Sequence, residues 1–218
     1  MDDEDLAEDL ATYFCRITDE FTPLTNFDPP GTYLAPFKPL MLHEVSKKIK
    51  EGKKPKSAVE GDIRPCISDK YSDITAIPAT RIINYSLLSL SWPAPWTVET
   101  QSAIPKTDNV ASFDQLRNIS CTNMLSKVLE SVILDQLREE ITIKRDQFGG
   151  MPGSGTVHFL IECWDKILRS LDSPEAAAAL ISIDFSKAFN RMDHRLCVEA
   201  LAECGASTES LAMVTPPS

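Results

Sequence analysis

The chain has 218 residues, 43% of them hydrophobic, and a formal net charge of −10 at pH 7. This length and apolar content suffice for a buried core and exclude an intrinsically disordered protein. The acidic balance argues against a generally basic nucleic-acid binder, but eight acids and one arginine fall in the first twenty residues, so the remaining chain is close to neutral.

The first 38 residues are predicted to form an acidic amphipathic helix and a proline-rich arm. Apolar residues recur at helical spacing between residues 5 and 21, with acids on the opposite face. Between Thr22 and Pro39 the chain has five prolines, which forbid regular structure. A second helix is expected to begin at Pro39 and to end at Gly52.

Residues 53–69 are expected to form a loop, and a third helix comes after it. Because proline breaks helices, this helix is predicted to follow a break at Pro78. Its apolar stripe consists of Ile82, Ile83, Leu87 and Leu88. The tryptophans and prolines of residues 92–96 indicate where the helix has ended.

A hairpin is predicted next. Two runs of strand character, residues 97–104 and 116–120, flank a polar loop. They predict two antiparallel strands on a long tip. Lys106 and Arg117 lie at the edges of this hairpin.

Two longer helices are predicted after the hairpin. Thr122 is expected to cap the first, over residues 123–140. A loop with four glycines, residues 147–156, separates it from the second, over residues 157–171. Their inward stripes are Leu125, Val128, Leu129, Val132 and Leu137 in the first, and Leu160, Ile161, Trp164, Leu168 and Leu171 in the second.

The segment from Ala178 to Ile183 is apolar and predicts a short buried strand that ends on a carboxylate, Asp184. A charge at the mouth of a buried strand is costly unless it is paired or used. Asp193 is expected to cap a helix that runs to Cys204. A strand, an acidic tip, an aromatic turn and a helix together indicate a metal-binding carboxylate at a sheet edge.

Six lysines lie between residues 47 and 56. A charge run of this kind is most often a solvated helix end and loop. A patch that faces phosphate groups is the alternative.

The six cysteines form no C-x-x-C pair and have no histidine at ligand spacing, so neither a zinc site nor a disulfide framework is predicted. The N-terminus is acidic and lacks an apolar leader, and no apolar run approaches the roughly 18 residues that cross a bilayer. We therefore expect an intracellular protein, cytoplasmic or nuclear, without a membrane partner.

Four groups of residues follow one another along the chain, and their order and approximate spacing matter more than any single motif. They are Ile104 to Lys106; Arg117 to Ser120 before a helix with Ser126, Lys127 and Glu130; Asp146 to Gly149; and Ile183 to Phe189 with Asp193 and His194. In this order they resemble the reverse transcriptase domain of non-LTR retrotransposons. The resemblance covers about residues 40–212.

The resemblance implies the fingers and part of the palm of a right-hand polymerase, with an RNA template, a DNA primer and a dNTP as partners. Asp184 matches the first metal-binding aspartate of the palm, which in that family helps to hold two Mg²⁺ ions for nucleotidyl transfer. Phe189 falls where the family places an aromatic under the incoming sugar; a core aromatic is the alternative. Lys106 and Arg117 resemble fingers residues that neutralise the triphosphate, and surface cations are the alternative.

The chain also departs from the family pattern. Asn190 stands where the family often has an acid after the aromatic. The paired aspartates and the thumb that the family places downstream are absent, since the only Asp-Asp is Asp2 and Asp3. One carboxylate cannot assemble a two-metal centre, so we expect an inactive reverse transcriptase fragment that does not bind Mg²⁺ tightly.

Two other functions are compatible with parts of the sequence. Residues 150–156 before a helix, followed by a strand ending at Asp184, imitate a P-loop nucleotidase, but Thr156 stands where the lysine belongs and Val157 where the Mg²⁺-binding hydroxyl belongs. A non-catalytic nucleic-acid-binding or protein-interaction remnant is the stronger alternative.

The predicted fold class is α+β, a truncated fingers-and-palm arrangement. Residues 1–38 form the acidic helix and arm. Residues 39–172 form a mainly helical, fingers-like domain with a two-stranded hairpin. Residues 173–218 form a partial palm, and the oligomeric state is left open.

Overall fold

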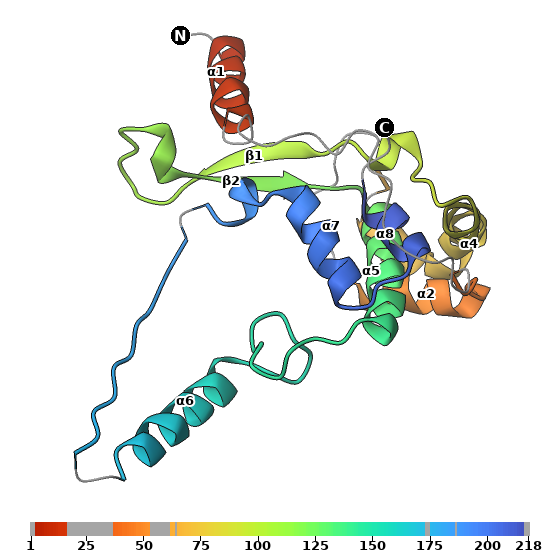
Figure 1. Ribbon diagram of the computed structural model, residues 1–218. Coiled ribbons are helices and arrows are strands. Elements are labelled where there is room, and N and C mark those ends of the chain that lie inside the picture. Colours follow the sequence, from red (N-terminus) through yellow and green to blue (C-terminus); the bar gives the residue numbers. More distant parts are fainter. Residues whose placement is uncertain are drawn as a thin grey trace. The chain divides into compact units, whose positions relative to one another are not determined.

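A computed structural model describes residues 3–16, 37–52, 62–63, 65–172, 175–185 and 187–215. These residues form helices and one antiparallel hairpin, as Figure 1 shows, which confirms the mixed helical and β content. The chain divides into a large unit, Met1–Ile141 with Asn190–Ser218, and a small unit, Thr142–Phe189. The right-hand arrangement and the predicted domain boundaries stay predictions. No helix among the described residues is long and apolar enough to span a membrane.

The predicted N-terminal helix is α1, Asp3–Cys15. Residues 17–36, with the end of the predicted helix and most of the proline-rich arm, lie outside the described residues. Tyr13 of α1 reaches the tip of the hairpin. Its hydroxyl donates a hydrogen bond to Oδ1 of Asp114 at 2.5 Å, and its ring centroid lies 5.4 Å from that of Phe113.

The core of the large unit forms where α2 (Leu42–Glu51), α4 (Ser72–Ser89) and α5 (Met124–Glu140) pack together. Apolar residues three and four positions apart give each helix one inward face. All five residues of the predicted α5 stripe are buried, so this prediction is confirmed. The buried residues that α2 and α4 bring to the core are Val45, Ile49, Ala76, Ala79, Ile83 and Leu87.

The predicted start of the second helix at Pro39 was wrong, because α2 begins at Leu42. The side chain of Asn84 holds the backbone of Leu40 on both sides: Leu40 N donates to Oδ1 at 2.8 Å, and Leu40 O accepts from Nδ2 at 2.9 Å. These two hydrogen bonds hold Leu40 in place before the helix begins. The predicted end at Gly52 is confirmed, since Gly52 caps the helix.

Two predictions about the next segment were also wrong. Residues Pro65–Lys70, nearly all within the predicted loop, form the short helix α3. Helix α4 continues through Pro78 instead of starting after it. Proline costs one hydrogen bond at this point, and Ala76, Ala79 and Ile83 around it are buried in the core.

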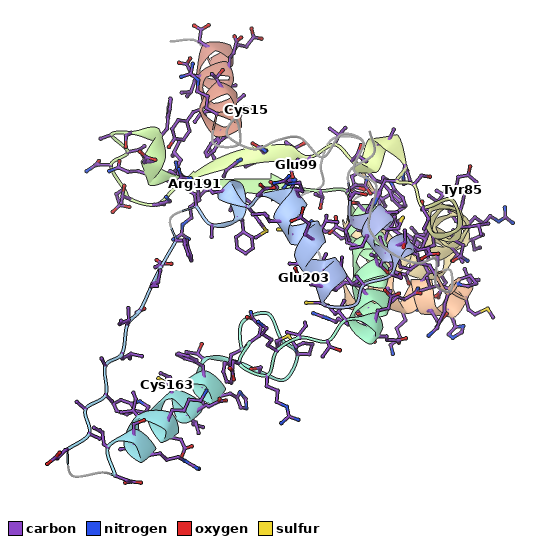
Figure 2. The ribbon with its side chains drawn as sticks, viewed as in Figure 1. Cys15, Tyr85, Glu99, Cys163, Arg191 and Glu203 are labelled. Carbon is purple, nitrogen blue, oxygen red and sulfur yellow. The ribbon has the colours of Figure 1, made fainter. Side chains whose placement is uncertain are left out.

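Only half of the predicted α4 stripe is buried. Ile83 and Leu87, four residues apart, lie in the core, whereas Ile82 and Leu88 are 39% and 81% exposed. Tyr85, 69% exposed, likewise projects away from the core (Figure 2). Four apolar residues within seven positions wrap too far around a helix to share one face.

Asp73 joins α4 to α2 through two contacts. Its Oδ1 accepts from Ser46 Oγ at 2.5 Å and from Lys50 Nζ at 3.1 Å. The hydrogen bond from Ser46, followed by that from Lys50, lowers the pKa of the Asp73 carboxyl. Because the folded state has the lower pKa, the stabilisation is present above the unfolded value and is lost as pH falls through the folded one.

We therefore expect Asp73→Asn to cost stability at about pH 6 and progressively less below about pH 4, near the ordinary aspartate pKa. Urea unfolding of both proteins across this range, followed by circular dichroism, measures the difference. A difference that stays constant with pH would show that the carboxylate charge does not matter there.

Two further helices of the large unit, α7 and α8, pack against each other, and α8 also packs against α5 (Figure 1). Helix α7 is His194–Glu203, and Asp193 caps it as predicted by accepting from Arg195 N and Leu196 N. Helix α8, Thr208–Val214, was not predicted. Trp92 holds the C-terminal end of α8, since its indole Nε1 donates a hydrogen bond to Met213 O at 2.8 Å. The predicted cap at Thr122 was wrong by one residue, because Asn123 caps α5.

The small unit contains α6, Thr156–Ser170, and an extended segment, residues 176–185 (Figure 1). The predicted buried strand before Asp184 was wrong, because no strand of the described residues pairs with this segment and Ile183 is 76% exposed. Strands require a neighbour that satisfies their backbone groups. In the described part of the chain, the two strands present pair with each other.

Candidate nucleotide and metal site

The hairpin consists of β1, Thr100–Pro105, and β2, Leu116–Cys121, as predicted. The strands are antiparallel, and Ile104 lies opposite Arg117. Lys106 continues the ladder, since its backbone N donates to Gln115 O at 2.8 Å. Because alternate residues of a strand share a face, Lys106 and Arg117 lie as diagonal neighbours on one face. Lys106 lies one residue beyond β1, so the extension of the register brings the backbones of these two predicted residues near each other.

The two cations differ in how they are held. Lys106 is exposed, and its Nζ donates to the backbone oxygen of Asp114 at 2.7 Å. Arg117 is also exposed, and its guanidinium has neither a hydrogen bond nor an ion pair within the described residues. Arginine offers five donors in a planar fork that matches phosphate oxygens. Arg117 is thus available to bind an anion. Lys106 must give up its hydrogen bond to the backbone oxygen of Asp114 before it can bind the same anion.

The opposite face of the hairpin stabilises the pairing. Asn118 Nδ2 donates to Gln101 Oε1 at 2.6 Å, between diagonal neighbours of the two strands. Nearby, Ser120 Oγ donates to Glu99 Oε1 at 2.9 Å. These cross-strand contacts fix the register and so keep Lys106 and Arg117 on a common face.

Asp184 and Phe189 both lie in the small unit. Asp184 is exposed and accepts no hydrogen bond from the described residues. Phe189 begins the short 3₁₀ helix Phe189–Arg191, and its side chain is 89% exposed. Lys106 and Arg117 belong to the large unit. The metal and sugar roles of Asp184 and Phe189 stay predictions.

A magnesium site needs several hard oxygen ligands. Asp184 is a suitable donor, because carboxylates are typical ligands of Mg²⁺. The described residues contain no group of three or more His, Cys, Asp or Glu side chains that could hold a metal ion. These residues therefore do not fit a two-metal centre by themselves.

The glycine-rich loop directly precedes α6. Gly150 and Gly153 adopt φ values of 73° and 72°, which non-glycine residues rarely adopt, and Gly155 caps the helix. Glycine is therefore favoured at both of these positions of the loop. Thr156 still provides no cation for a phosphate, and the nucleotidase function stays a prediction.

The described lysines of the basic cluster are largely used within the fold. Lys48 Nζ donates to Ser131 Oγ at 2.8 Å and to Asp135 Oδ2 at 2.6 Å. Lys50 forms the ion pair with Asp73. Lys53, Lys54 and Lys56 lie outside the described residues. For Lys48 and Lys50 the contacts favour a structural role over a phosphate-facing patch.

The sequence analysis missed a pocket of about 560 Å³ in the large unit. Its wall is mainly apolar and comes from α5, α7, the end of α8 and the Trp92–Trp96 turn. Cys197 lines it, and burial, with a smaller effect of the Asp193 charge, raises the pKa of this thiol. The tryptophans of residues 92–96 were the available signal, because such large side chains usually find apolar neighbours. The pocket-lining residues from this turn and the three helices include Trp92, Trp96, Ile133, Leu137, Val198 and Met213.

Comparison with known protein families decides the identity of the fold. Residues 104–214, just over half of the chain, match the family described as reverse transcriptase (RNA-dependent DNA polymerase). The chain belongs to the reverse transcriptase family. The matched range includes Lys106, Arg117, Asp184 and Phe189. The predicted recognition is thereby confirmed at the level of the family.

A relative among retrotransposons refines this result. The reverse transcriptase chain is 26% identical over 137 residues to the retrovirus-related Pol polyprotein from type-1 retrotransposable element R2 of Popillia japonica. The match covers 61% of the chain and 19% of that polyprotein, so the chain spans about a fifth of its relative. Together with the family match, this similarity supports the predicted non-LTR class.

Proposed function

We propose that the chain provides the triphosphate-binding hairpin and the first metal-binding carboxylate of an RNA-directed DNA polymerase of retroelement origin. The observation that carries this proposal is the exposed pair Lys106 and Arg117 on one hairpin face, inside the region that matches the family. Neighbouring cations on a rigid ladder suit a ligand with several adjacent negative charges. A triphosphate and a nucleic-acid backbone both have that chemistry.

Within this function the two cations have different tasks. Arg117 binds phosphate oxygens with its planar fork, which also orients the ligand. Lys106 adds a point charge at the position diagonal to Arg117. The hydrogen bond from its Nζ to the backbone oxygen of Asp114 orients this charge. Both interactions position and neutralise the ligand without chemical change.

Asp184 supplies one carboxylate oxygen to Mg²⁺, and other carboxylates must complete the site. In a completed site, where Asp184 would hold Mg²⁺ together with further carboxylates, the metal would activate the primer hydroxyl and stabilise charge on the phosphate. Phe189 offers an exposed ring on which the sugar of the incoming nucleotide packs. With one carboxylate, the chain as given holds Mg²⁺ weakly and does not extend a primer.

Fluorescence anisotropy with a labelled RNA template annealed to a DNA primer tests the proposal, followed by a primer-extension reaction with dNTPs and Mg²⁺. The expected result is binding, displaced by excess dNTP, without extension. Absence of binding contradicts the role of the hairpin. Extension by this chain alone contradicts its predicted inactivity, while leaving the family assignment intact.

A non-catalytic nucleic-acid-binding module is the second candidate. It is favoured by the exposed Arg117, which is equally available to a backbone phosphate. Under this alternative, primer–template binds but is not displaced selectively by dNTP over inorganic phosphate at equal ionic strength. Turnover of ATP that is lost in Asp184→Asn would instead indicate the nucleotidase.

A further inference from the structure

Helix α1 is strongly acidic, and it lies before the residues that match the reverse transcriptase family. Its residues Asp3–Cys15 include five acids and no base, and Arg16 follows directly. Four of these acids have exposed side chains, namely Glu4, Asp5, Glu8 and Asp9. The helix therefore brings several negative charges to the part of the molecule that it contacts.

Tyr13 attaches α1 to the tip of the hairpin, within the large unit. Its hydroxyl donates to Asp114 Oδ1 at 2.5 Å, and its ring centroid lies 5.4 Å from that of Phe113. Both partners belong to the 3₁₀ turn Phe113–Gln115, which leads into β2. In Figure 2 the labelled Cys15 marks the end of α1 that is nearest to the hairpin. A hydrogen bond to a carboxylate and an aromatic pair thus stabilise the docking of α1.

Asp114 connects this contact to one cation of the proposed site. Its carboxylate accepts from Tyr13, and its backbone oxygen accepts from Lys106 Nζ at 2.7 Å. Lys106 must give up this hydrogen bond before it binds an anion. Because Tyr13 holds the residue that offers the backbone oxygen, docked α1 favours the conformation in which Lys106 is retained by the loop.

We propose that α1 is an autoinhibitory element, whose docking through Tyr13 weakens the binding of primer–template to Lys106 and Arg117. This proposal rests on the function proposed above for the hairpin. Docking and binding oppose each other in two ways. Docked α1 stabilises the hydrogen bond that retains Lys106, and its negative charges repel the phosphates of the nucleic acid.

The acidic side chains of α1 lie close enough to the docking contact for this repulsion. An α-helix rises about 1.5 Å per residue, which places Glu8 and Asp9 about 6–8 Å along the axis from Tyr13. The Debye length is about 10 Å at 0.1 M salt, so these two charges are only partly screened at the hairpin tip. By linkage, primer–template weakens the docking of α1 by the same factor by which docking weakens its affinity.

Fluorescence anisotropy with labelled primer–template at about 0.05 M KCl tests the proposal. Tyr13→Ala removes both docking contacts. With α1 docked in roughly nine molecules out of ten, this variant should bind about tenfold more tightly than the unaltered chain. Tyr13→Phe keeps the ring and should bind with an intermediate affinity. Glu8→Gln combined with Asp9→Asn keeps the Tyr13 contacts and should gain about threefold, because only the repulsion is lost.

The matched controls lie on other helices of the large unit. Tyr85→Ala removes an exposed tyrosine of α4, and Glu51→Gln combined with Glu203→Gln removes two exposed acids of α2 and α7. Both controls should bind within about twofold of the unaltered chain. Circular dichroism confirms that each variant is folded. Amide hydrogen exchange is a second measurement, in which saturating primer–template should speed exchange within α1.

The outcomes separate this proposal from the function of the hairpin. Tyr13→Ala that binds only as tightly as the unaltered chain, or more weakly, overturns autoinhibition and leaves the hairpin function intact. Gains of equal size in the variants and their controls, or exchange in α1 that primer–template does not change, overturn it as well. Absence of binding by both the unaltered chain and Tyr13→Ala overturns both proposals.

Discussion

Replacement of Leu129 by alanine is expected to lower the free energy of unfolding by about 2–5 kcal/mol, the usual cost of removing a buried leucine side chain. Leu129 is fully buried in the middle of α5. It belongs to the core that joins α2, α4 and α5 with Met213 at the end of α8. The loss combines the transfer free energy of the deleted groups with the cavity that they leave.

Leu134→Ala is the matched control for this prediction. Leu134 lies on the same helix and is 43% exposed, so its truncation should cost less than about 1 kcal/mol. Urea unfolding followed by circular dichroism measures both variants. Equal losses for Leu129→Ala and Leu134→Ala would contradict the assigned inward face of α5.

The double variant Lys106→Ala with Arg117→Ala is expected to weaken primer–template binding by about a hundredfold at roughly 0.1 M salt. Each cation that contacts a phosphate releases about 0.9 counterions from a duplex, which amounts to about tenfold in affinity at that salt concentration. Arg117 should account for the larger share of the lost affinity. It can bind a phosphate without breaking a hydrogen bond to another described residue, whereas Lys106 cannot.

Arg138→Ala is the control for this experiment. Arg138 is an exposed arginine in the last turn of α5, on a different element of the large unit, and its removal changes the net charge as Arg117→Ala does. Anisotropy with the labelled primer–template compares the variants. An equal loss for Arg138→Ala would mean that net charge, and not the hairpin face, determines binding.

Local signals in the sequence predicted the elements that depend on them. The hairpin follows from two short β-prone runs around a polar loop, and the α5 stripe follows from helical spacing. The cap at Asp193 was predicted for the same reason, since a side chain near the first turn satisfies the backbone. None of these features requires a distant partner to be identified.

The errors arise where distant contacts decide the local structure. Asn84 holds the backbone of Leu40 from another helix, which moves the start of α2. Helix α4 tolerates Pro78 because its neighbours are buried against the core. Residues 178–183 look like a strand in isolation, but a strand also needs a neighbour, which their own sequence cannot specify.

The candidate site was predictable in part. The register that places Lys106 and Arg117 on one face follows from their predicted positions in a hairpin. The contact from Lys106 to the backbone of Asp114, and the absence of such a contact for Arg117 within the described residues, depend on the conformation of the loop. The role of Asp184 rests on the family resemblance, because an exposed carboxylate alone does not identify a metal ligand.

The salt dependence of primer–template affinity tests the role of the hairpin most directly. Anisotropy titrations from about 25 to 200 mM KCl give the slope of log affinity against log salt concentration. The hairpin assignment predicts a slope that is less negative by nearly two for the Lys106→Ala, Arg117→Ala variant than for the unaltered chain. Parallel lines for the two proteins, or affinity that does not change with salt, would contradict it.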